Sequence, residues 1–409
     1  MLREAAGKRP GVLTKVGIGT FVDPHYEGCA MNDAARQRAI VARREFNNET
    51  WLYFEPIAPN VAIIRASVAD EKGNLSFDQE GAYLGAMEMA LAAHNSGGIV
   101  IAQVKRIAKN GTLKPHTVRV PGVLVDYIVE APEQLQTTAT PYDPAISGEL
   151  FRPEHDFALP EHGIGKVIAR RVAQELEPGW AVNIGFGISA NVPRILLEEG
   201  QHGSVTWVIE QGAVGGIPLL DFKFGCSSNA EAYVASPHQF AYFQAGGFDA
   251  ALLSFLEIGA DGSVNVSKLG VCPHRTAGAG GFVDITTRAE KLVFSGNFNA
   301  GARVSIRDGR LFIDKEGGIA KLVPEVEQIS FSGVEAVRKG QDVTYITERC
   351  VIKLTPEGLV VNEVAPGIRV KEDVLDLTDV SLLVADDLKT MDGNLFHKGP
   401  IGLWQQRTH

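Results

Sequence analysis

Cysteine is scarce in this chain and is never grouped. Four cysteines occur in 409 residues, and Cys29, Cys226, Cys272 and Cys350 contain no CxxC pair. A disulfide framework or a structural zinc site is therefore not expected, and the sequence fits a reducing cytoplasm. The ten histidines show no HExxH motif and no cluster with ligand spacing, so we predict no metal site.

Concentrated positive charge and long apolar runs are absent as well. Lys and Arg number 39 against 49 Asp and Glu, which leaves a net charge of -10. Nucleic acid is therefore not an expected partner. No apolar stretch approaches the ~20 residues of a transmembrane helix, and no basic-then-apolar signal opens the chain. We expect a cytoplasmic protein without membrane contact, long enough for about two or three domains.

What the sequence does contain is a regular alternation of strands and helices. Residues 61–69 (VAIIRASVA) and 97–104 (GGIVIAQV) have the β-branched, apolar character of buried strands. Between them, residues 81–97 have helical spacing and an Asn-Ser-Gly stop. Residues 180–210 repeat the order strand, helix, strand. This alternation predicts an α/β fold with mainly parallel sheets.

Two parts of the chain look alike on either side of a polar, proline-containing stretch at 140–163. Residues 61–77 and 250–267 each contain an apolar strand, an acidic turn with glycine and a short extended piece. Gly73 and Gly262 align at an offset of 189 residues (262 − 73). We interpret the two parts as α/β halves of related design.

The predicted division is a first half at 1–139, a linker at 140–163 and a second half at 164–409. The second half opens with a strand, a glycine turn and a helix, at 180–200. The first half starts beyond the point where such a unit would stand. We therefore expect the first half to be incomplete at its N-terminus.

One carboxylate, Glu210, is surrounded in the sequence by glycine-rich segments. It ends the strand predicted at 204–210, and Gly215 and Gly216 follow in the loop VIEQGAVGGIP. A carboxylate at the end of a buried strand costs several kcal/mol unless it is used or paired. A further cluster, expected just before a strand in RTAGAGGFVDI, contains Gly278, Gly280 and Gly281. Such loops expose N–H groups that stabilise an oxyanion, and a carboxylate can be the nucleophile of covalent catalysis.

A third glycine pattern offers a different interpretation. Gly185, Gly187 and Ala190 spell G-x-G-x-x-A between a strand and a helix, and Glu210 follows 20 residues after Ala190 (210 − 190). This pattern is typical of dinucleotide binding, but a tight turn between a strand and a helix produces it too. An NAD-dependent enzyme stays an alternative. The long glycine loop after Glu210, where a Rossmann unit would continue with a helix, counts against it.

Many separate segments resemble the family I coenzyme A transferases. They are GVLTKVGIGTFVDP, NSGGIVIAQVKRI, KPHTVRVPGVLVDYIV, YDPAISGELFRP, VIEQGAVGGIP, FGCSSNAEA, GADGSVNVSKLG, AGAGGFVDIT, EVEQISFSG, YITERCVIKLTPEGL and EVAPGI. The resemblance covers essentially the whole chain in order. It is strongest to the single-chain propionate/acetate CoA-transferases, of acyl-CoA:acetate/3-ketoacid type, in which both halves are fused. Compared with that subgroup, the chain lacks about a hundred N-terminal residues, the size of a small domain.

The resemblance implies transfer of coenzyme A (CoA) between short-chain acyl-CoAs, such as propionyl-, acetyl- or acetoacetyl-CoA, and carboxylic acids such as acetate. Short-chain fatty acid or ketone body metabolism would be its setting. Glu210 matches the family's nucleophile, which forms a mixed anhydride and then a glutamyl–CoA thioester in a ping-pong mechanism. CoA is then substrate and covalent intermediate, and no tightly bound cofactor is expected. The competing interpretation of Glu210 is a paired structural acid.

The resemblance also assigns roles to glycines. Gly281 is implied as a backbone donor to the oxyanion, with Gly280 beside it in the CoA-contacting turn that begins at Gly278. Glycine suits this turn because a Cβ would obstruct the approaching thioester. Gly215 and Gly216 are expected to shape the loop behind the nucleophile and to contact CoA.

Asn229 matches an asparagine that lies near the glutamate in relatives and can hydrogen-bond the thioester carbonyl. Its alternative role is the cap of a helix predicted to start at 230–234. Two positions depart from the family pattern: Cys29 stands where glycine is usual, and Gln211, beside the nucleophile, stands where a small residue is commoner.

Two further alternatives remain at the level of function. A truncated relative could keep the CoA-binding half and serve as a non-catalytic binding or assembly subunit. An acyl-CoA hydrolase would use the same glutamyl thioester with water in place of the acid. Because relatives form dimers or tetramers, we expect a homo-oligomer.

Overall fold

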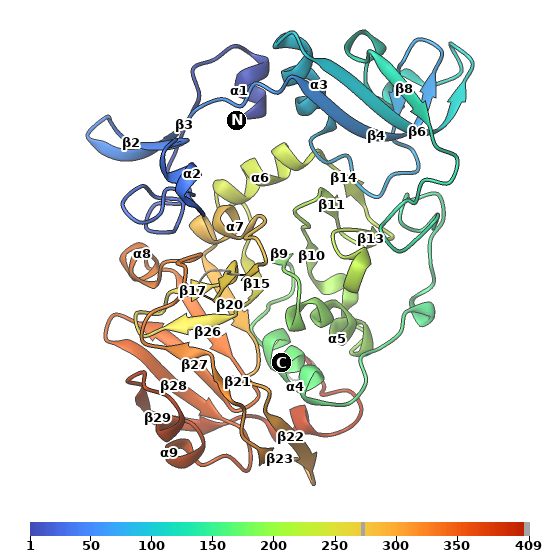
Figure 1. Cartoon of the computed structure of the whole chain (residues 1–409). Coiled ribbons are helices and arrows are strands. Elements are labelled where there is room, and N and C mark those ends of the chain that lie inside the picture. Colours follow the sequence, from blue (N-terminus) through green and yellow to red (C-terminus); the bar gives the residue numbers. More distant parts are fainter. Residues whose placement is uncertain (271–274, 405–409) are drawn as a thin grey trace. The chain divides into compact units, whose positions relative to one another are not determined.

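The computed structural model describes residues 1–270 and 275–404 and divides into two compact units (Figure 1). Unit 1 comprises Met1–Ile18, Val22–Arg152 and Val208–Ala241. Unit 2 comprises Gly19–Phe21, Pro153–Trp207 and the chain from Tyr242 onward. Cys272 lies outside the described residues. None of the helices within the described ranges has the length and apolar character needed to cross a membrane.

The two units cross the division that the sequence predicts. Residues 208–241 belong to the predicted second half, yet they pack with the first part of the chain in unit 1. The units also change over between Arg152 and Pro153, inside the stretch 140–163. The division into 1–139, 140–163 and 164–409 therefore stays a prediction. The compact units of the structure follow other boundaries.

Unit 1 is built on a five-stranded sheet in the order β7-β5-β4-β6-β8. Its strands are β4 (Val61–Asp70), β5 (Leu75–Ser76), β6 (Ile99–Ala108), β7 (Val118–Val120) and β8 (Tyr127–Glu130). β4, β6 and β8 run parallel, and β5 and β7 join antiparallel. The strands predicted at 61–69 and 97–104 are confirmed as β4 and β6.

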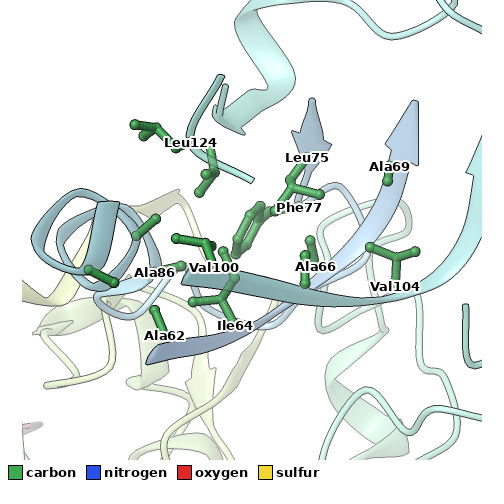
Figure 2. Close-up of a cluster of buried hydrophobic side chains, with 14 residues drawn as sticks. Ala62, Ile64, Ala66, Ala69, Leu75, Phe77, Ala86, Val100, Val104 and Leu124 are labelled. Carbon is green, nitrogen blue, oxygen red and sulfur yellow. The ribbon is translucent and has the colours of Figure 1, made fainter. Parts of the chain in front are cut away.

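One face of this sheet forms the core of unit 1 together with helix α3 (Ala86–Asn95). Alternate residues of β4, such as Ala62 and Ile64, point into it, and Figure 2 shows them beside Val100 and the helix that carries Ala86. The predicted helix stop is confirmed, because the helix ends at Asn95 and Gly97 has a φ of +77°.

The remaining elements of unit 1 are short. Sheets form in the orders β1-β3-β2, β11-β14 and β12-β13. The elements are α1 (Leu2–Ala6), β1 (Val12–Thr14), α2 (Asp33–Arg36), β2 (Val41–Phe46), β3 (Glu49–Phe54), η1 (Pro115–Thr117), η2 (Gly122–Leu124), β11 (Ala213–Val214), β12 (Ile217–Pro218), η6 (Asp221–Lys223), β13 (Ser227–Ser228) and β14 (Ala232–Tyr233).

Unit 2 is built on an eight-stranded sheet in the order β10-β9-β15-β20-β26-β27-β28-β29. Its strands are β9 (Ala181–Ile184), β10 (Thr206–Trp207), β15 (Ala250–Ser254), β20 (Lys291–Ser295), β26 (Asp342–Ile346), β27 (Cys350–Thr355), β28 (Gly358–Val364) and β29 (Leu383–Thr390). The first five are parallel, β27 is antiparallel to both neighbours, and β28 and β29 are parallel. The predicted α/β class with mainly parallel strands is confirmed.

Helices and smaller strands complete unit 2. The helices are α4 (Ile164–Ala173), α5 (Val192–Glu198), α7 (Phe282–Arg288), α8 (Gly333–Lys339) and α9 (Val370–Asp373), with the 3-10 turns η3 (Glu154–Asp156), η4 (Ile188–Asn191), η5 (His202–Ser204), η7 (Leu375–Leu377) and η8 (Gly393–Phe396). The small strands are β16 (Glu257–Gly259), β17 (Val264–Asn265), β18 (Lys268–Leu269), β19 (Arg275–Thr276), β21 (Asn299–Ala300), β22 (Arg303–Arg307), β23 (Arg310–Lys315), β24 (Ile319–Ala320) and β25 (Leu322–Val323). Helix α6 (Ser236–Gln244) spans the change from unit 1 to unit 2.

The predicted internal similarity is present in the structure. Gly73 and Gly262 both have a positive φ, +84° and +79°. Each donates its N–H to the residue three positions earlier, Asp70 and Gly259, at 2.9 Å in both cases. In unit 1 the turn joins β4, which pairs in parallel with β6, to its antiparallel partner β5. In unit 2 the turn joins β16 to its antiparallel partner β17, and the strand that pairs in parallel with β20 is β15, just before β16. The two α/β halves therefore repeat one strand–turn–strand design.

The two copies differ in how their strands are covered. Ile63 on β4 corresponds to Leu252 on β15 (63 + 189 = 252), and Ile63 is 72% exposed whereas Leu252 is fully buried. β15 pairs with β9 on one side and β20 on the other. Among the described residues, Val61–Ala66 of β4 pairs only with β6. Ala62 and Ile64 are buried on the opposite face from the exposed Ile63, so the sheet of unit 1 has one buried and one open face at this point.

Of the two strands predicted around the glycine segments, one is shorter than predicted and the other is wrong. The strand predicted at 204–210 ends as β10 at Trp207, because the chain turns before Glu210. The segment after Gly281 is helix α7 and not a strand. Its β-branched residues misled the prediction: Val283 and Ile285 are buried in the helix, and propensity yields to packing.

Candidate active site

The predicted site residues fall into two groups. Unit 1 contains Glu210, Gly215, Gly216 and Asn229, all within Val208–Ala241. Unit 2 contains Gly278, Gly280 and Gly281. The structure therefore gathers the predicted nucleophile and three of its proposed neighbours in one compact unit. Residues 278–281, called the G-x-G-G segment below, belong to the other unit.

Glu210 stands in a tight turn directly after a buried apolar run. The N–H of Gly212 donates to the carbonyl of Ile209 at 2.9 Å, and the N–H of Ile209 donates to the carbonyl of Ala213 at 2.9 Å. Ile209 is 1% exposed, whereas Glu210 is half-buried. The turn thus ends the buried run and places Glu210 at a partly exposed position, which answers how a buried run tolerates an acid.

The turn depends on Gly212. Its φ is +117°, and a Cβ at this position would lie 1.9 Å from the carbonyl oxygen of Val234. The N–H of Val234 in turn donates to the Gly212 carbonyl at 2.9 Å. Only glycine allows the turn and the segment at Val234 to approach so closely.

Gln211 holds the side chain of Glu210. Its amide Nε2 donates to Glu210 Oε1 at 3.1 Å. The Gln211 side chain lies over Gly225, where a Cβ would stand 2.7 Å from the Gln211 Cδ. The Oγ of Ser236 donates to the Gln211 carbonyl at 3.2 Å. The sequence marked Gln211 only as a departure from the family pattern, and nothing local in the sequence signals this bond.

Gly215 and Gly216 link β11 to β12 with φ values of +74° and +71°. A Cβ on Gly216 would lie 2.3 Å from the carbonyl oxygen of Ser228, and one on Gly215 would lie 2.7 Å from the carboxyl carbon of Glu231. The two glycines therefore let β11, whose Ala213 closes the Glu210 turn, fold tightly against the 227–233 segment.

Asn229 makes a local contact that the sequence did not suggest. Its Nδ2 donates to the Arg152 carbonyl and its Oδ1 accepts from the Arg152 N–H, both at 2.8 Å. Strand β14 follows, and helix α6 begins only at Ser236, so the predicted helix at 230–234 and its cap are wrong. Asn229 instead ties two segments of unit 1 together from a φ of +59°.

The G-x-G-G segment precedes helix α7. Gly278 and Gly280 are exposed and have φ values of +82° and +53°. Gly281 is buried at the N-cap of α7, and its carbonyl accepts the N–H of Ile285 at 3.0 Å. The segment therefore exposes the main chain of Gly278 and Gly280 just before a helix start, whereas Gly281 itself is buried.

The glycines of the dinucleotide-like pattern are explained by packing. A Cβ on Gly185 would lie 2.8 Å from Leu253, and one on Gly187, with its φ of +115°, would lie 2.3 Å from Ser254 Oγ. Both glycines let the turn between β9 and η4 lie directly against β15. A tight turn accounts for the pattern, so the structure gives no support to the NAD-dependent alternative.

Cys226, next to Gly225, is not a competing nucleophile. Burial raises the pKa of its thiol to about 11. Near neutral pH the side chain is therefore a thiol and not the thiolate that attacks carbonyl carbons. Within the part of the chain that the structure describes, no three His, Cys, Asp or Glu side chains gather to hold a metal ion.

Comparison with known proteins agrees with this architecture. The pattern of the coenzyme A transferase family matches residues 1–131. The caffeate CoA-transferase of Acetobacterium woodii is 44% identical over 406 residues, which is 98% of this chain and 77% of that protein. The acetate CoA-transferase YdiF of Escherichia coli K12 is 38% identical over 404 residues, 98% of this chain and 75% of its own.

Solved structures give the same result. The crystal structure of the acyl-CoA transferase YdiF from Escherichia coli O157:H7, as apoenzyme, matches with a TM-score of 0.91 at 37% identity and covers 98% of this chain and 75% of that one. A thioester complex of that protein with CoA matches with a TM-score of 0.90 at 37% identity, with the same coverage.

Fold and comparisons together define an α/β transferase of the type that carries both halves in one chain. The chain belongs to the coenzyme A transferase family, family I.

Proposed function

We propose that this chain transfers CoA between a short-chain acyl-CoA and a small carboxylic acid such as acetate, with Glu210 as the nucleophile. The observation that carries the proposal is the position of Glu210. It is a half-buried carboxylate held at the tip of a glycine-dependent turn, within a chain that matches CoA-transferases over 98% of its length.

The proposed chemistry needs no metal and no ATP. Glu210 attacks the thioester carbonyl and displaces the CoA thiolate, which leaves a mixed anhydride. The thiolate then attacks the glutamyl carbonyl carbon, releases the first acid and forms a glutamyl–CoA thioester. A second acid reverses both steps. The cycle replaces one thioester by another, so the overall free-energy change is small and CoA passes between acids in a ping-pong cycle.

The remaining site residues enter as part of the same proposal. The backbone N–H of Gly281 would donate to the oxyanion that forms on the thioester, with Gly278 and Gly280 in the CoA-contacting turn. Asn229 uses one N–H of its amide for the Arg152 carbonyl, and the second N–H would serve the thioester carbonyl. Gly215 and Gly216 would shape the loop behind Glu210.

The acid that this chain prefers is a further element of the proposal. The relatives above carry the names of an acetate and a caffeate CoA-transferase. We propose the small aliphatic acid as the acceptor, and caffeate is the comparison substrate in the test. CoA as substrate rather than resident cofactor, a homo-oligomer and a cytoplasmic location stay predictions.

The test is intact mass spectrometry after incubation with propionyl-CoA, followed by borohydride. We expect a CoA-sized mass gain on Glu210 that borohydride converts to a reduced side chain. Glu210→Ala should lose the adduct and about four orders of magnitude in kcat, as removal of a covalent nucleophile does. Glu357→Gln, on an exposed turn, is the matched control and should behave as the native chain.

Three results would redirect the proposal. Unchanged turnover in Glu210→Ala would remove Glu210 as the nucleophile. A folded chain that binds CoA without adduct or turnover would indicate the non-catalytic alternative. Acyl-CoA consumption that does not depend on added acid would indicate the hydrolase alternative.

A further inference from the structure

We propose that Gln211 is a positioning residue for the reaction: it fixes one oxygen of Glu210 and stabilises the charge that forms there when the glutamyl carbon is attacked. The inference rests on the proposed role of Glu210. It goes beyond that role because it assigns the two oxygens of the carboxylate different tasks.

Gln211 contacts a defined oxygen of the carboxylate. Gln211 Nε2 donates to Glu210 Oε1 at 3.1 Å. Gln211 is held at its side chain and at its main chain. The Cδ of its side-chain amide lies against Gly225, and its main-chain carbonyl accepts a hydrogen bond from the Oγ of Ser236. The donor therefore meets Oε1 without further rearrangement, which is the condition for preorganised stabilisation.

The orientation of the Gln211 amide is explained by this bond alone. Its own Oε1 is buried and has no hydrogen-bond partner within the described residues. An unpaired buried carbonyl oxygen costs free energy, so hydrogen bonding of the Gln211 Oε1 does not explain this orientation of the amide. A flipped amide would set its oxygen against the Glu210 carboxylate, acceptor against acceptor. The contact to Glu210 decides which way the amide points.

The charge at Oε1 changes in a defined order. When Oε2 attacks the acyl-CoA carbonyl, the new C–O bond forms, the C–S bond breaks and CoA leaves as thiolate. Oε1 is now the glutamyl carbonyl oxygen of the anhydride. When the thiolate attacks Cδ, an electron pair moves onto Oε1. It returns as the bond from Cδ to Oε2 breaks, and the first acid leaves as a carboxylate.

The second acid repeats this charge movement. Its carboxylate attacks Cδ of the glutamyl–CoA thioester, Oε1 again receives the electron pair, and CoA leaves as thiolate. Two of the four chemical steps therefore develop an oxyanion at the atom that Gln211 holds. A neutral amide suits this site, because a cation would stabilise the resting carboxylate and weaken it as a nucleophile.

The experiment compares Gln211→Ala with the native chain in single turnover with propionyl-CoA. We expect kcat to fall about 10- to 100-fold, as loss of one donor to a charged oxygen does. The first displacement develops no charge on Oε1, so the release of free thiol should be slowed less than the steps that follow it. The glutamyl–CoA adduct should form slowly, and the ratio of hydrolysed to transferred acyl group should rise as water intercepts the anhydride.

A second variant keeps the size of the side chain and removes the donor. Gln211→Glu places a carboxylate beside Glu210, so transfer at neutral pH should fall at least as far as in Gln211→Ala. At lower pH the introduced carboxyl becomes protonated and can donate, so activity should recover and the pH profile should shift toward acid. A merely structural role predicts no such shift. Gln37→Ala, on an exposed turn, is the matched control.

Failure of this inference is distinguishable from failure of the proposed function. If both Gln211 variants are folded and keep native kcat, adduct formation and pH profile while Glu210→Ala is inactive, Gln211 has no such role and Glu210 keeps its own. If Gln211→Ala is unstable, Gln211→Glu with its pH profile decides. If Glu210→Ala remains active, both proposals fall together.

Discussion

At the scale of single residues, the site depends on the space that glycines leave around Glu210. Gly212 brings Val234 against the turn and Gly225 lies against Gln211, and Gly216 brings Ser228 against the loop that follows the turn; each has a positive φ. Their effect on the carboxylate is indirect, because they set where the backbone of Glu210 and the amide of Gln211 can lie. A single Cβ must displace backbone at Gly212 and Gly216, and the Gln211 side chain at Gly225.

Gly212→Ala tests this dependence. The new Cβ would meet the Val234 carbonyl oxygen at 1.9 Å, and alanine disfavours a φ of +117°. We expect a loss of about 2–4 kcal/mol in unfolding free energy and a drop of about 10- to 100-fold in kcat from misplacement of Glu210. Gly203→Ala is the control, because its Cβ would meet nothing within 4 Å. Denaturant unfolding and initial rates measure both, and native values for Gly212→Ala would contradict the strained turn.

Cys29 is a non-glycine residue in a backbone conformation that favours glycine. Its φ is +64°, in the region that favours glycine, at the position where the family pattern has glycine. The sequence could mark the departure, and only the backbone conformation explains why glycine is usual there.

At the scale of elements, the internal repeat predicts opposite responses at equivalent positions. Leu252 is buried between covered faces of the sheet of unit 2, whereas Ile63 lies on the open face of β4 at 72% exposure. Leu252→Thr should lower stability by about 3–5 kcal/mol, through a cavity and a buried hydroxyl. Ile63→Thr keeps a β-branched residue on an exposed face and should stay within about 0.5 kcal/mol of the native chain.

Urea unfolding followed by circular dichroism and by tryptophan fluorescence measures the pair. Each variant is the control for the other, because both place threonine at the same position of a repeated strand. Equal losses in the two variants would mean that the face of β4 is covered in solution.

Elements also show where local sequence misleads. The segment after Gly281 is rich in β-branched residues, yet it forms α7, whose Phe282 and Val283 are buried. The apolar run before Glu210 extends past the end of β10, because the turn at Ile209–Gly212 interrupts it. In both cases contacts with distant segments override the propensity of the residues concerned.

At the scale of the whole molecule, buried charge makes stability depend on pH. Arg349 is fully buried in unit 2 and makes two hydrogen bonds of 2.8 Å to Glu316. Burial alone would raise the pKa of Glu316, but hydrogen bonds from Arg349, Asn299 and Gly317 outweigh it and lower the pKa to about 2. The folded state therefore holds this carboxylate ionised more firmly than the unfolded chain does.

The sign of the effect follows from the two pKa values. The folded pKa is below the unfolded value of 4.5, so the stabilisation is fully present above pH 4.5 and is lost as the pH falls toward 2. Glu316→Gln should lower the unfolding free energy at pH 7 by about 1–2 kcal/mol, a figure reduced for the partial exposure of Glu316. The difference from the native chain should shrink steadily between pH 4.5 and pH 2.

Thermal unfolding across this pH range measures the difference. Glu372→Gln, an exposed glutamate on α9, is the control and should show no such trend. A stability difference for Glu316→Gln that stays constant from pH 7 to pH 2 would contradict the assignment of the ionised pair.

The sequence by itself determined the class of protein, the main parallel strands and the repeated turn at Gly73 and Gly262. These features are carried by local periodicity and by motifs whose order is kept along the chain, so no knowledge of distant contacts is needed. Only the tertiary structure decided that Glu210 stands in a turn, that Gln211 holds its Oε1, and that Asn229 binds the backbone of Arg152, 77 residues away. Such contacts join residues that are distant in sequence, or orient side chains by the packing around them, and no local pattern encodes either.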